Sequence, residues 1–295
     1  MTAEYPFAPN YLDLNGGRYH YIDEGEGKPV LMVHGNPTWS YYYRNVVLRL
    51  RDRYRCVVPD HIGCGRSDKP TEDRYTYTLS SRVADLTRLA DELELDDITL
   101  VVHDWGGMIG MAWAVDHVDR IRKIVILNTG AFARPGGKTF PPSIALARVP
   151  MLGAGLVRGF SAFSRGANRF CVTRNPLPAH VKAAYLEPYD NWEHRIAVHR
   201  FVTDIPLKPS DPAWPVLQRT SDNLHKLAGL PIMVAWGMRD FVFDHHFLEE
   251  WERRFPDADV HRFEDAGHYI LEDAKEEVLD LIDRFVDGPA AAESA

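Results

Sequence analysis

The chain has 295 residues, of which 45% are hydrophobic and 26% charged, so it is long and apolar enough for one large globular α/β domain or a domain with an insertion. Its net charge of −8, with no basic run, disfavours nucleic acid as a partner. The three cysteines show no metal spacing and disfavour a disulfide framework. Neither a signal region nor a run of about 18 apolar residues occurs, so we expect a cytoplasmic protein without a transmembrane segment.

Strand and helix patterns alternate through the first half of the chain. Short apolar or alternating runs predict strands, and apolar residues spaced i, i+3, i+4 predict helices between them. The predicted strands cover residues 18–23, 29–34, 55–59, 98–102 and 123–128. A first helix is expected near Thr38, its predicted N-cap, and further helices cover 81–95 and 108–117. This alternation favours an α/β fold with a mostly parallel central sheet and helices on both faces.

The alternation stops after Asn128. Residues 131–215 contain no clear buried strand but several helical patterns, and we interpret them as a helical cap inserted into the sheet domain. Strand patterns resume at 231–236 and 259–263, with helices at 245–254, capped by Asp244, and at 275–286. We therefore expect a core of residues 1–130 and 216–288, a cap of residues 131–215, and a disordered tail at residues 289–295.

An apolar stretch with several arginines lies inside the predicted cap, over residues 140–170. Packing within the cap accounts for this composition. Two alternatives stay open, because the same stretch suits a tunnel for alkyl chains and also a surface that touches a membrane or a partner protein.

The strongest chemical signal follows the strand at 98–102. His103-Asp104-Trp105-Gly106-Gly107 joins this strand to a helix over two glycines, a tight turn that presents its apex residue, Asp104, outward. Enzymes with this elbow usually carry serine at the apex, and no Gly-x-Ser-x-Gly occurs in the chain. A carboxylate here is a nucleophile that needs no deprotonation and leaves an ester intermediate. The alternative is that Asp104 only caps the helix that begins at Trp105.

Asp104, Asp240 and His268 each follow a predicted strand. Because the carboxyl ends of parallel strands share one edge of the sheet, we expect the three side chains to converge. Their order of nucleophile, acid and histidine matches that of α/β-hydrolases. We predict that His268 is the base and that Asp240 orients it and stabilises its imidazolium. In some relatives of this architecture the acid follows the strand before the cap, but Asn128-Thr129 offers no carboxylate there, so Asp240 takes the role.

Two further residues predict a site for a leaving anion. The backbone N–H groups of Trp105 and Asn36 would form an oxyanion hole, and the Trp105 indole and the Asn36 side-chain amide are additional donors. The alternatives are that Trp105 packs under the cap and that Asn36 stabilises the turn before Pro37. We interpret His34 and His103, which flank these motifs, as supporting histidines rather than catalysts.

Signals for a metal or a cofactor are weak. Asp244-His245-His246 has ligand-type side chains, but no further ligand set accompanies them, so we interpret this run as the start of a surface helix. The loop Gly63-Cys64-Gly65 is too short for a phosphate cradle. We therefore expect neither a metal nor a cofactor.

The short motifs of the chain resemble those of the haloalkane dehalogenase family of α/β-hydrolases. They are His-Gly-Asn-Pro-Thr at residues 34–38, Asp-His-Ile-Gly-Cys-Gly-Arg-Ser-Asp-Lys-Pro at 60–70 and His-Asp-Trp-Gly-Gly at 103–107. In that family the elbow aspartate displaces halide, the following tryptophan and the asparagine bind the halide, and the histidine activates water. The resemblance implies these roles for Asp104, Trp105, Asn36 and His268.

Longer runs resemble the β-lactone decarboxylases of bacterial long-chain olefin biosynthesis. They lie at residues 39–44, 74–79, 128–132, 156–160 and 240–247, and the resemblance extends over roughly residues 15 to 285. Epoxide hydrolases are a weaker match, since they usually have an aromatic residue where Asn36 stands. They also use paired cap tyrosines, whereas Tyr185 and Tyr189 lie one short helical turn apart.

The resemblance implies decarboxylation of a cis-3-alkyl-4-alkyl-oxetan-2-one, a β-lactone with long alkyl chains, to a cis-alkene and CO₂. It also implies association with the β-lactone synthetase and other enzymes of the olefin pathway, in an assembly peripheral to the membrane. The main alternative is a haloalkane dehalogenase that hydrolyses a carbon–halogen bond through an aspartyl ester, and a third is a non-catalytic binding protein. The role of His268 stays open in a decarboxylase, because no water enters the net reaction.

Overall fold

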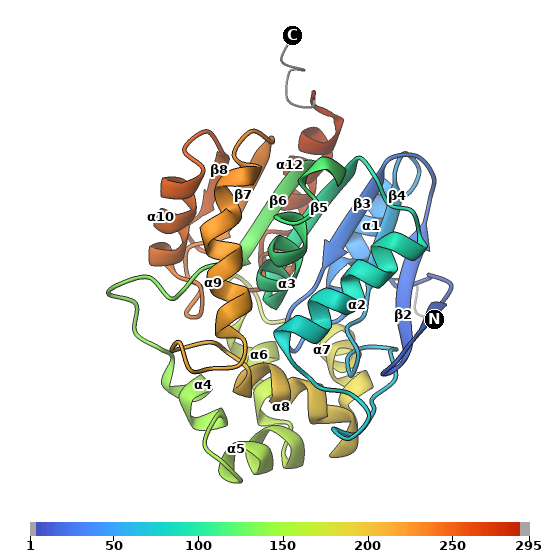
Figure 1. The fold of residues 1–295 in the computed structure, drawn as a ribbon. Helices are drawn as coiled ribbons and strands as arrows, with labels where there is room; N and C mark the ends of the chain where they lie inside the picture. The colour runs from blue at the N-terminus through green and yellow to red at the C-terminus, as the bar shows by residue number, and fades with distance from the viewer. Residues whose placement is uncertain (1–3, 290–295) are drawn as a thin grey trace.

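The computed structural model describes residues 4–289, so the predicted tail at 289–295 lies outside the described residues except for Pro289. Within them the strands form one eight-stranded sheet in the order β1-β2-β4-β3-β5-β6-β7-β8 (Figure 1). The strands are β1 Asn10–Leu14, β2 Gly17–Glu24, β3 Pro29–Val33, β4 Arg55–Pro59, β5 Ile98–Asp104, β6 Ile121–Thr129, β7 Ile232–Gly237 and β8 Asp259–Phe263. β1, β2 and β4 pair antiparallel, whereas all pairs from β4 through β3 to β8 are parallel. The prediction of a mostly parallel sheet is confirmed.

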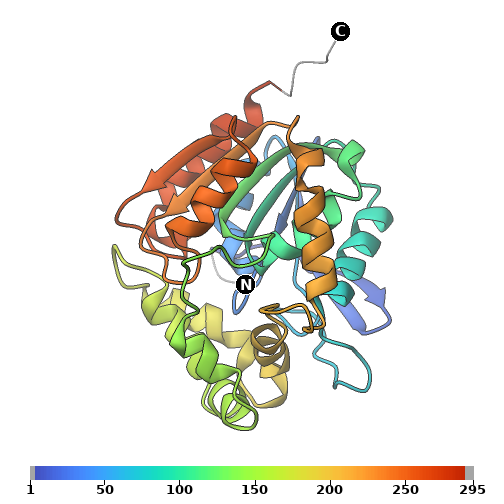
Figure 2. The same ribbon diagram turned by 60° about the vertical axis from the view of Figure 1, so that its left-hand side comes forward.

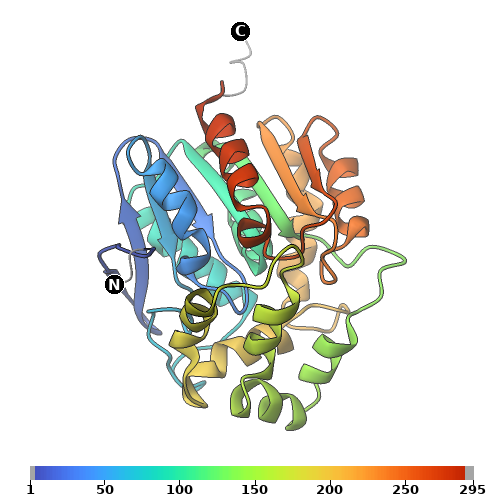
Figure 3. The same ribbon diagram turned by 180° about the vertical axis from the view of Figure 1, so that it is seen from behind.

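Helices cover both faces of this sheet (Figures 1 and 3). One face carries α2 Leu79–Glu92, α3 Trp105–Ala114, α9 Trp214–Asn223 and α10 His245–Arg254, and the other carries α1 Arg44–Leu50 and α12 Lys275–Asp287. Because successive residues of a strand point to opposite faces, Leu31 and Val33 pack in the core on the α2 and α3 side of the sheet. Val30 and Met32 pack in the core on the α1 and α12 side. All four are fully buried, as expected for a parallel sheet that is covered on both faces.

The chain leaves the sheet between β6 and β7. Except for α9, the intervening helices lie together beyond the carboxyl ends of the parallel strands in all three ribbon views (Figures 1, 2 and 3). They are α4 Pro142–Ala147, α5 Leu152–Ala154, α6 Ala162–Phe170, α7 Ala179–Leu186 and α8 Ile196–Thr203. The predicted lack of strands in residues 131–215 is confirmed. The predicted division into core and cap stays a prediction, and its limit at residue 215 falls in the first turn of α9, a helix that packs on α3.

Some element ends differ from the sequence prediction. The helix predicted to begin at Met108 begins at Trp105 in the structure, so Gly106 already belongs to α3. Gly106 packs so closely on β3 that a Cβ there would lie 1.9 Å from the Val33 carbonyl oxygen. The prediction that Thr38 caps a helix is wrong, since Trp39 is extended and the chain turns into a 3₁₀ helix only at Ser40–Tyr43.

Two further local features concern a cap and an edge strand. The predicted N-cap at Asp244 is confirmed, because its carboxylate accepts the backbone N–H of His246. The half-exposed strand β1 at the sheet edge was not predicted, since its alternation mixes polar and apolar residues. Within residues 4–289 we find no helix whose length and apolar character would suit a bilayer crossing.

Candidate active site

The elbow between β5 and α3 places Asp104 in a strained conformation. Its φ of 51° lies in the left-handed region that non-glycine residues rarely adopt. The hydroxyl of Thr129 donates to the backbone carbonyl of Asp104 and ties the elbow to the neighbouring strand β6. The turn therefore presents the carboxylate at the carboxyl edge of the sheet, as the two glycines of the motif predict.

Asp104, His268 and Asp240 form a continuous chain of contacts at this edge. His268 donates from Nδ1 to Oδ2 of Asp240 at 2.7 Å, and its Nε2 lies 3.5 Å from Oδ2 of Asp104. Asp104 ends β5, and the other two follow β7 and β8, so three parallel strands supply the three side chains. All three are buried. The structure thus brings together the residues that the sequence predicts as a triad, whose catalytic roles stay a prediction.

The charges of Asp240, His268 and Asp104 shift the pKa values of His268 and Asp104. Burial alone would lower the pKa of His268, but the charge of Asp240 and the hydrogen bonds to both carboxylates outweigh it and raise that pKa to about 10. Burial would raise the pKa of Asp104, yet the hydrogen bond and charge of His268 and the N–H of Asn36 lower it below its ordinary value. At neutral pH the site therefore holds an imidazolium beside an ionised Asp104 carboxylate.

Asn128 contacts the acid of the triad directly. Its Nδ2 donates to Oδ2 of Asp240 at 3.0 Å and to the carbonyl of Gly237 at 3.1 Å, and its Oδ1 accepts the N–H of Gly237 at 2.8 Å. The other carboxylate oxygen of Asp240 accepts the N–H of Val242 at 2.7 Å. From the sequence, Asn128 offered no carboxylate and was expected only to hydrogen-bond nearby, and the structure places that hydrogen bond on Asp240.

His103 contacts His268 through the backbone. Its Nε2 donates to the carbonyl of His268 at 2.9 Å, and its ring stacks on Tyr42 with centroids 4.3 Å apart. Burial lowers the pKa of His103 to about 3, so the ring stays neutral. His34 lies one strand away and donates from Nδ1 to the carbonyl of Gly35 at 2.7 Å. Both contacts agree with the interpretation of these residues as supporting histidines.

The loop after β3 supplies a donor to the nucleophile. The backbone N–H of Asn36 donates to Oδ1 of Asp104 at 2.6 Å, and a Cβ on Gly35 would lie 2.1 Å from the same oxygen, so only glycine permits this approach. The Asn36 side chain donates from Nδ2 to the carbonyl of Val198 in α8 at 3.2 Å. An amide has two N–H groups, which leaves the second for a bound anion. Trp105 follows the nucleophile directly, and both predicted anion-binding residues line the same cavity as Asp104.

This cavity has a volume of about 400 Å³, within the range of small-molecule sites. Most of its walls are apolar side chains of the cap, among them Phe140, Ile144, Leu156, Phe163 and Phe170. The polar groups of Asp104, Asn36, Trp105 and His268 interrupt this apolar lining. Such a cavity suits a hydrophobic substrate with one reactive polar group.

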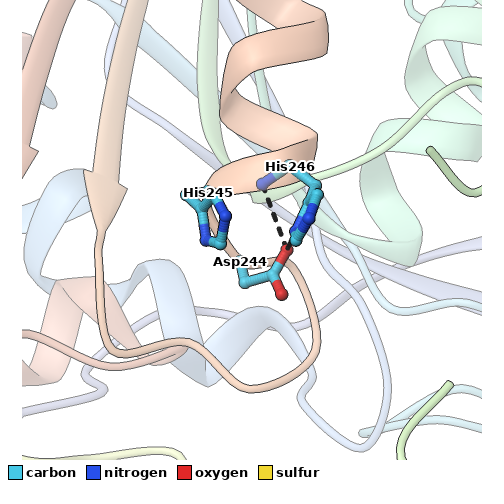
Figure 4. Close-up of side chains that lie close together, drawn as sticks. All are labelled: Asp244, His245 and His246. Carbon is cyan, nitrogen blue, oxygen red and sulfur yellow. Dashed lines mark hydrogen bonds and ion pairs between the residues drawn. The ribbon is translucent and has the colours of Figure 1, made fainter. Parts of the chain in front are cut away.

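The cluster Asp244, His245 and His246 lies at the first turn of α10, and its ligand-type atoms lie within 4.8 Å of one another (Figure 4). One carboxylate oxygen of Asp244 caps the helix by accepting the N–H of His246 at 3.1 Å. The other accepts from Nζ of Lys138 at 3.0 Å, and Lys138 also donates to the carbonyl of Phe241 at 2.9 Å. These contacts explain the cluster as the N-cap of α10, which Lys138 joins to the start of the segment 131–215. We assign no metal to it.

The two cap tyrosines are engaged elsewhere. Tyr185 donates to Oε1 of Glu272 at 2.5 Å, and Tyr189 donates to the carbonyl of Thr38 at 3.2 Å. Neither tyrosine lines the cavity. The paired hydroxyls that an epoxide hydrolase needs therefore do not face Asp104.

Comparison with protein families and relatives identifies similar chains. Residues 28–275 match the family model described as alpha/beta hydrolase fold. Two relatives named cis-3-alkyl-4-alkyloxetan-2-one decarboxylase, from Shewanella oneidensis and Xanthomonas campestris pv. campestris, are 51% and 48% identical to this chain. These alignments cover 95% and 96% of this chain and 89% and 97% of the relatives.

Haloalkane dehalogenases are similar at lower identity. Haloalkane dehalogenase 2 of Mycobacterium tuberculosis is 33% identical, over 95% of this chain and 96% of its own. Among solved structures, the haloalkane dehalogenase DpaA from Paraglaciecola agarilytica has a TM-score of 0.80 at 29% identity, covering 95% of this chain and 93% of its own. The haloalkane dehalogenase DbeA from Bradyrhizobium elkani reaches 0.84 at 23% identity, with 95% and 99% covered, which shows a shared fold.

Proposed function

The chain belongs to the alpha/beta hydrolase fold family and, within it, to the family of the cis-3-alkyl-4-alkyloxetan-2-one decarboxylases, and we propose that it decarboxylates such a β-lactone to a cis-alkene and CO₂. The observation that carries this proposal is the buried Asp104–His268–Asp240 chain on the wall of an apolar cavity. A long-chain lactone matches that cavity, because its only polar group is the ring that must meet the nucleophile.

The first step opens the ring. Oδ2 of Asp104 forms a bond to C4, the alkyl-bearing ring carbon that is bonded to the ring oxygen, with inversion at C4. The bond between this carbon and the ring oxygen breaks, and the ring oxygen leaves as part of a carboxylate on the neighbouring carbon. The indole N–H of Trp105 and the amide of Asn36 bind this carboxylate, where a dehalogenase would bind halide.

The second step releases both products. The bond to the carboxylate breaks, its electron pair forms the alkene, and the bond to Asp104 breaks to restore the free carboxylate and CO₂. No proton and no water are consumed. Inversion followed by anti elimination converts a cis-lactone into a cis-alkene, so the stereochemistry is consistent with the named reaction.

His268 has a place in this mechanism as an imidazolium. Its Nε2 faces Oδ2 of Asp104, and its raised pKa of about 10 keeps it charged at neutral pH. A positive charge beside the departing aspartate stabilises the carboxylate that forms in the second step. A dehalogenase instead needs a neutral histidine at some stage, because that histidine must take a proton from water.

We also propose that the lactone arrives from the enzyme that closes its ring. The support is the exposed apolar surface of the cap, where Met151 is 88% and Phe160 75% exposed. A hydrophobic substrate passes more readily between adjoining apolar surfaces than through water. Co-sedimentation with the ring-closing enzyme, weakened by Met151→Glu with Phe160→Glu, tests this contact.

One parallel assay tests the main proposal. The wild-type chain is offered a long-chain cis-3,4-dialkyl-oxetan-2-one and a 1-haloalkane, with alkene measured by gas chromatography and halide by ion chromatography. Alkene without halide supports the decarboxylase. Halide without alkene would instead establish the haloalkane dehalogenase, the second candidate, which the 33% identity to that family favours less.

A further inference from the structure

Arg82 is a buried cation that the two steps above do not use. It lies on α2 with no exposed surface, and its guanidinium carbon lies 3.6 Å from the ring centre of Phe201 and 5.6 Å from that of Trp105. α2 and α3 lie side by side on one face of the sheet, with α8 of the cap below them in Figure 1. Trp105 lines the cavity and Arg82 does not, so the charge lies behind the indole.

The charge of Arg82 is only partly compensated. Its Nη1 donates to Oδ2 of Asp204 at 3.3 Å, but the same oxygen also accepts the N–H of Leu79 at 2.7 Å. Burial raises the pKa of Asp204, which works against full ionisation of that partner. Nε and Nη2 of Arg82 have no hydrogen-bond partner among residues 4–289. A buried cation with unsatisfied donors costs stability, so packing does not explain why an arginine stands here.

We propose that Arg82 is a positioning residue for the leaving carboxylate and acts on it through Trp105. A cation against the face of an indole polarises the π electrons of the ring and makes the ring N–H a stronger hydrogen-bond donor. The fixed positive charge also stabilises the negative charge that moves from Asp104 to the carboxylate as the ring opens. The identity of this anion rests on the proposed function, but the effect applies to any small anion bound beside Trp105.

The test separates this role from a simple ion pair between core and cap. The variant Arg82→Met with Asp204→Asn removes both charges and keeps an acceptor for Leu79, whereas Asp204→Asn alone breaks the ion pair and leaves the cation. Each protein is titrated with sodium bromide while tryptophan fluorescence is recorded, with Trp105→Phe as the blank. Decarboxylation of a cis-lactone is measured in parallel, and thermal unfolding shows whether each variant is folded.

We expect the neutral pair to weaken bromide binding and kcat by about tenfold, the equivalent of about 1.4 kcal/mol for a buried cation–π contact, with KM changed much less. Asp204→Asn should keep wild-type bromide affinity, and Arg82→Lys should restore part of the loss. Equal losses in Asp204→Asn and in the neutral pair would show an ion pair only and overturn the proposal, as would unchanged binding in both. If the neutral pair does not fold, Arg82→Gln with Asp204→Asn replaces it. Because bromide binding needs no lactone, failure of the decarboxylase assay in the wild type leaves this comparison decisive.

Discussion

Asn128 and His268 donate hydrogen bonds to the same oxygen, Oδ2 of Asp240, over 3.0 and 2.7 Å. The asparagine is the last residue but one of β6 and Asp240 follows the adjacent strand β7, so the sheet itself fixes the distance between them. Asn128 also bonds both backbone polar groups of Gly237, three residues before Asp240. The amide therefore fixes the direction in which the acid presents its oxygen to His268.

Replacing Asn128 by alanine should slow turnover more than it changes substrate binding. The variant leaves the N–H of Gly237 without its acceptor, at a cost of about 1–3 kcal/mol of stability, and frees Asp240 to rotate. We expect kcat to fall about tenfold or more with KM little changed, since small misplacements of catalytic groups are costly. Asn168→Ala is the matched control, because that buried amide donates to the carbonyl of Lys182 in the cap, away from the site. Equal kcat values in the two variants would contradict a positioning role for Asn128.

Asp104→Asn should abolish alkene formation by removing the nucleophile. An amide oxygen is a far weaker nucleophile than a carboxylate, and loss of a covalent catalyst commonly costs about a thousandfold or more in kcat. The measurement is alkene release under saturating lactone, with Asp119→Asn, an exposed position, as the control. Intact mass spectrometry after rapid quenching should show the lactone mass on the wild-type chain and none on Asp104→Asn. Alkene formed by Asp104→Asn near the wild-type rate would exclude covalent catalysis.

The raised pKa of His268 predicts an alkaline limit for both activity and stability. The value of about 10 lies above the ordinary 6.5, so the stabilisation from its ion pairs is fully present below about pH 6.5 and is lost as pH rises through about 10. A decarboxylase that needs the imidazolium should show constant kcat through neutral pH and a decline as pH approaches 10. His268→Asn should lack this decline while keeping part of its activity. A rate that instead rises between pH 6 and 8 would indicate that neutral His268 acts as a general base on water.

The sequence predicts that the three side chains lie together because their geometry follows from topology. Asp104, Asp240 and His268 each follow a strand, and the carboxyl ends of parallel strands lie on one edge whatever the details of packing. Asn36 is identified for the same reason, since it follows β3, the strand that pairs with β5. These predictions needed only the position of each residue relative to a strand end.

The contacts that the sequence did not predict depend on side-chain direction. Arg82 shares one helix face with Leu86 and Leu89, all buried, and a charge on that apolar stripe is the signal in the sequence for a buried cation. Its partners Phe201 and Asp204 lie in the cap, and how the cap helices sit on the core cannot be derived from periodicity. The same holds for the cavity, whose walls come from several helices at once.

Narrowing the cavity should select against long substrates. Ala167 of α6 lines the cavity and is 8% exposed, so Ala167→Phe inserts a ring into space that an alkyl chain would occupy. Burying one methylene is worth about 0.8 kcal/mol, so excluding two or three of them should lower kcat/KM for a long-chain lactone by about tenfold or more. A lactone with short alkyl groups should lose much less, because its ring still reaches Asp104. Ala145→Phe is the matched control, since Ala145 lies exposed in the cap and does not line the cavity. Equal losses for long and short lactones in Ala167→Phe would place the alkyl chains outside this cavity.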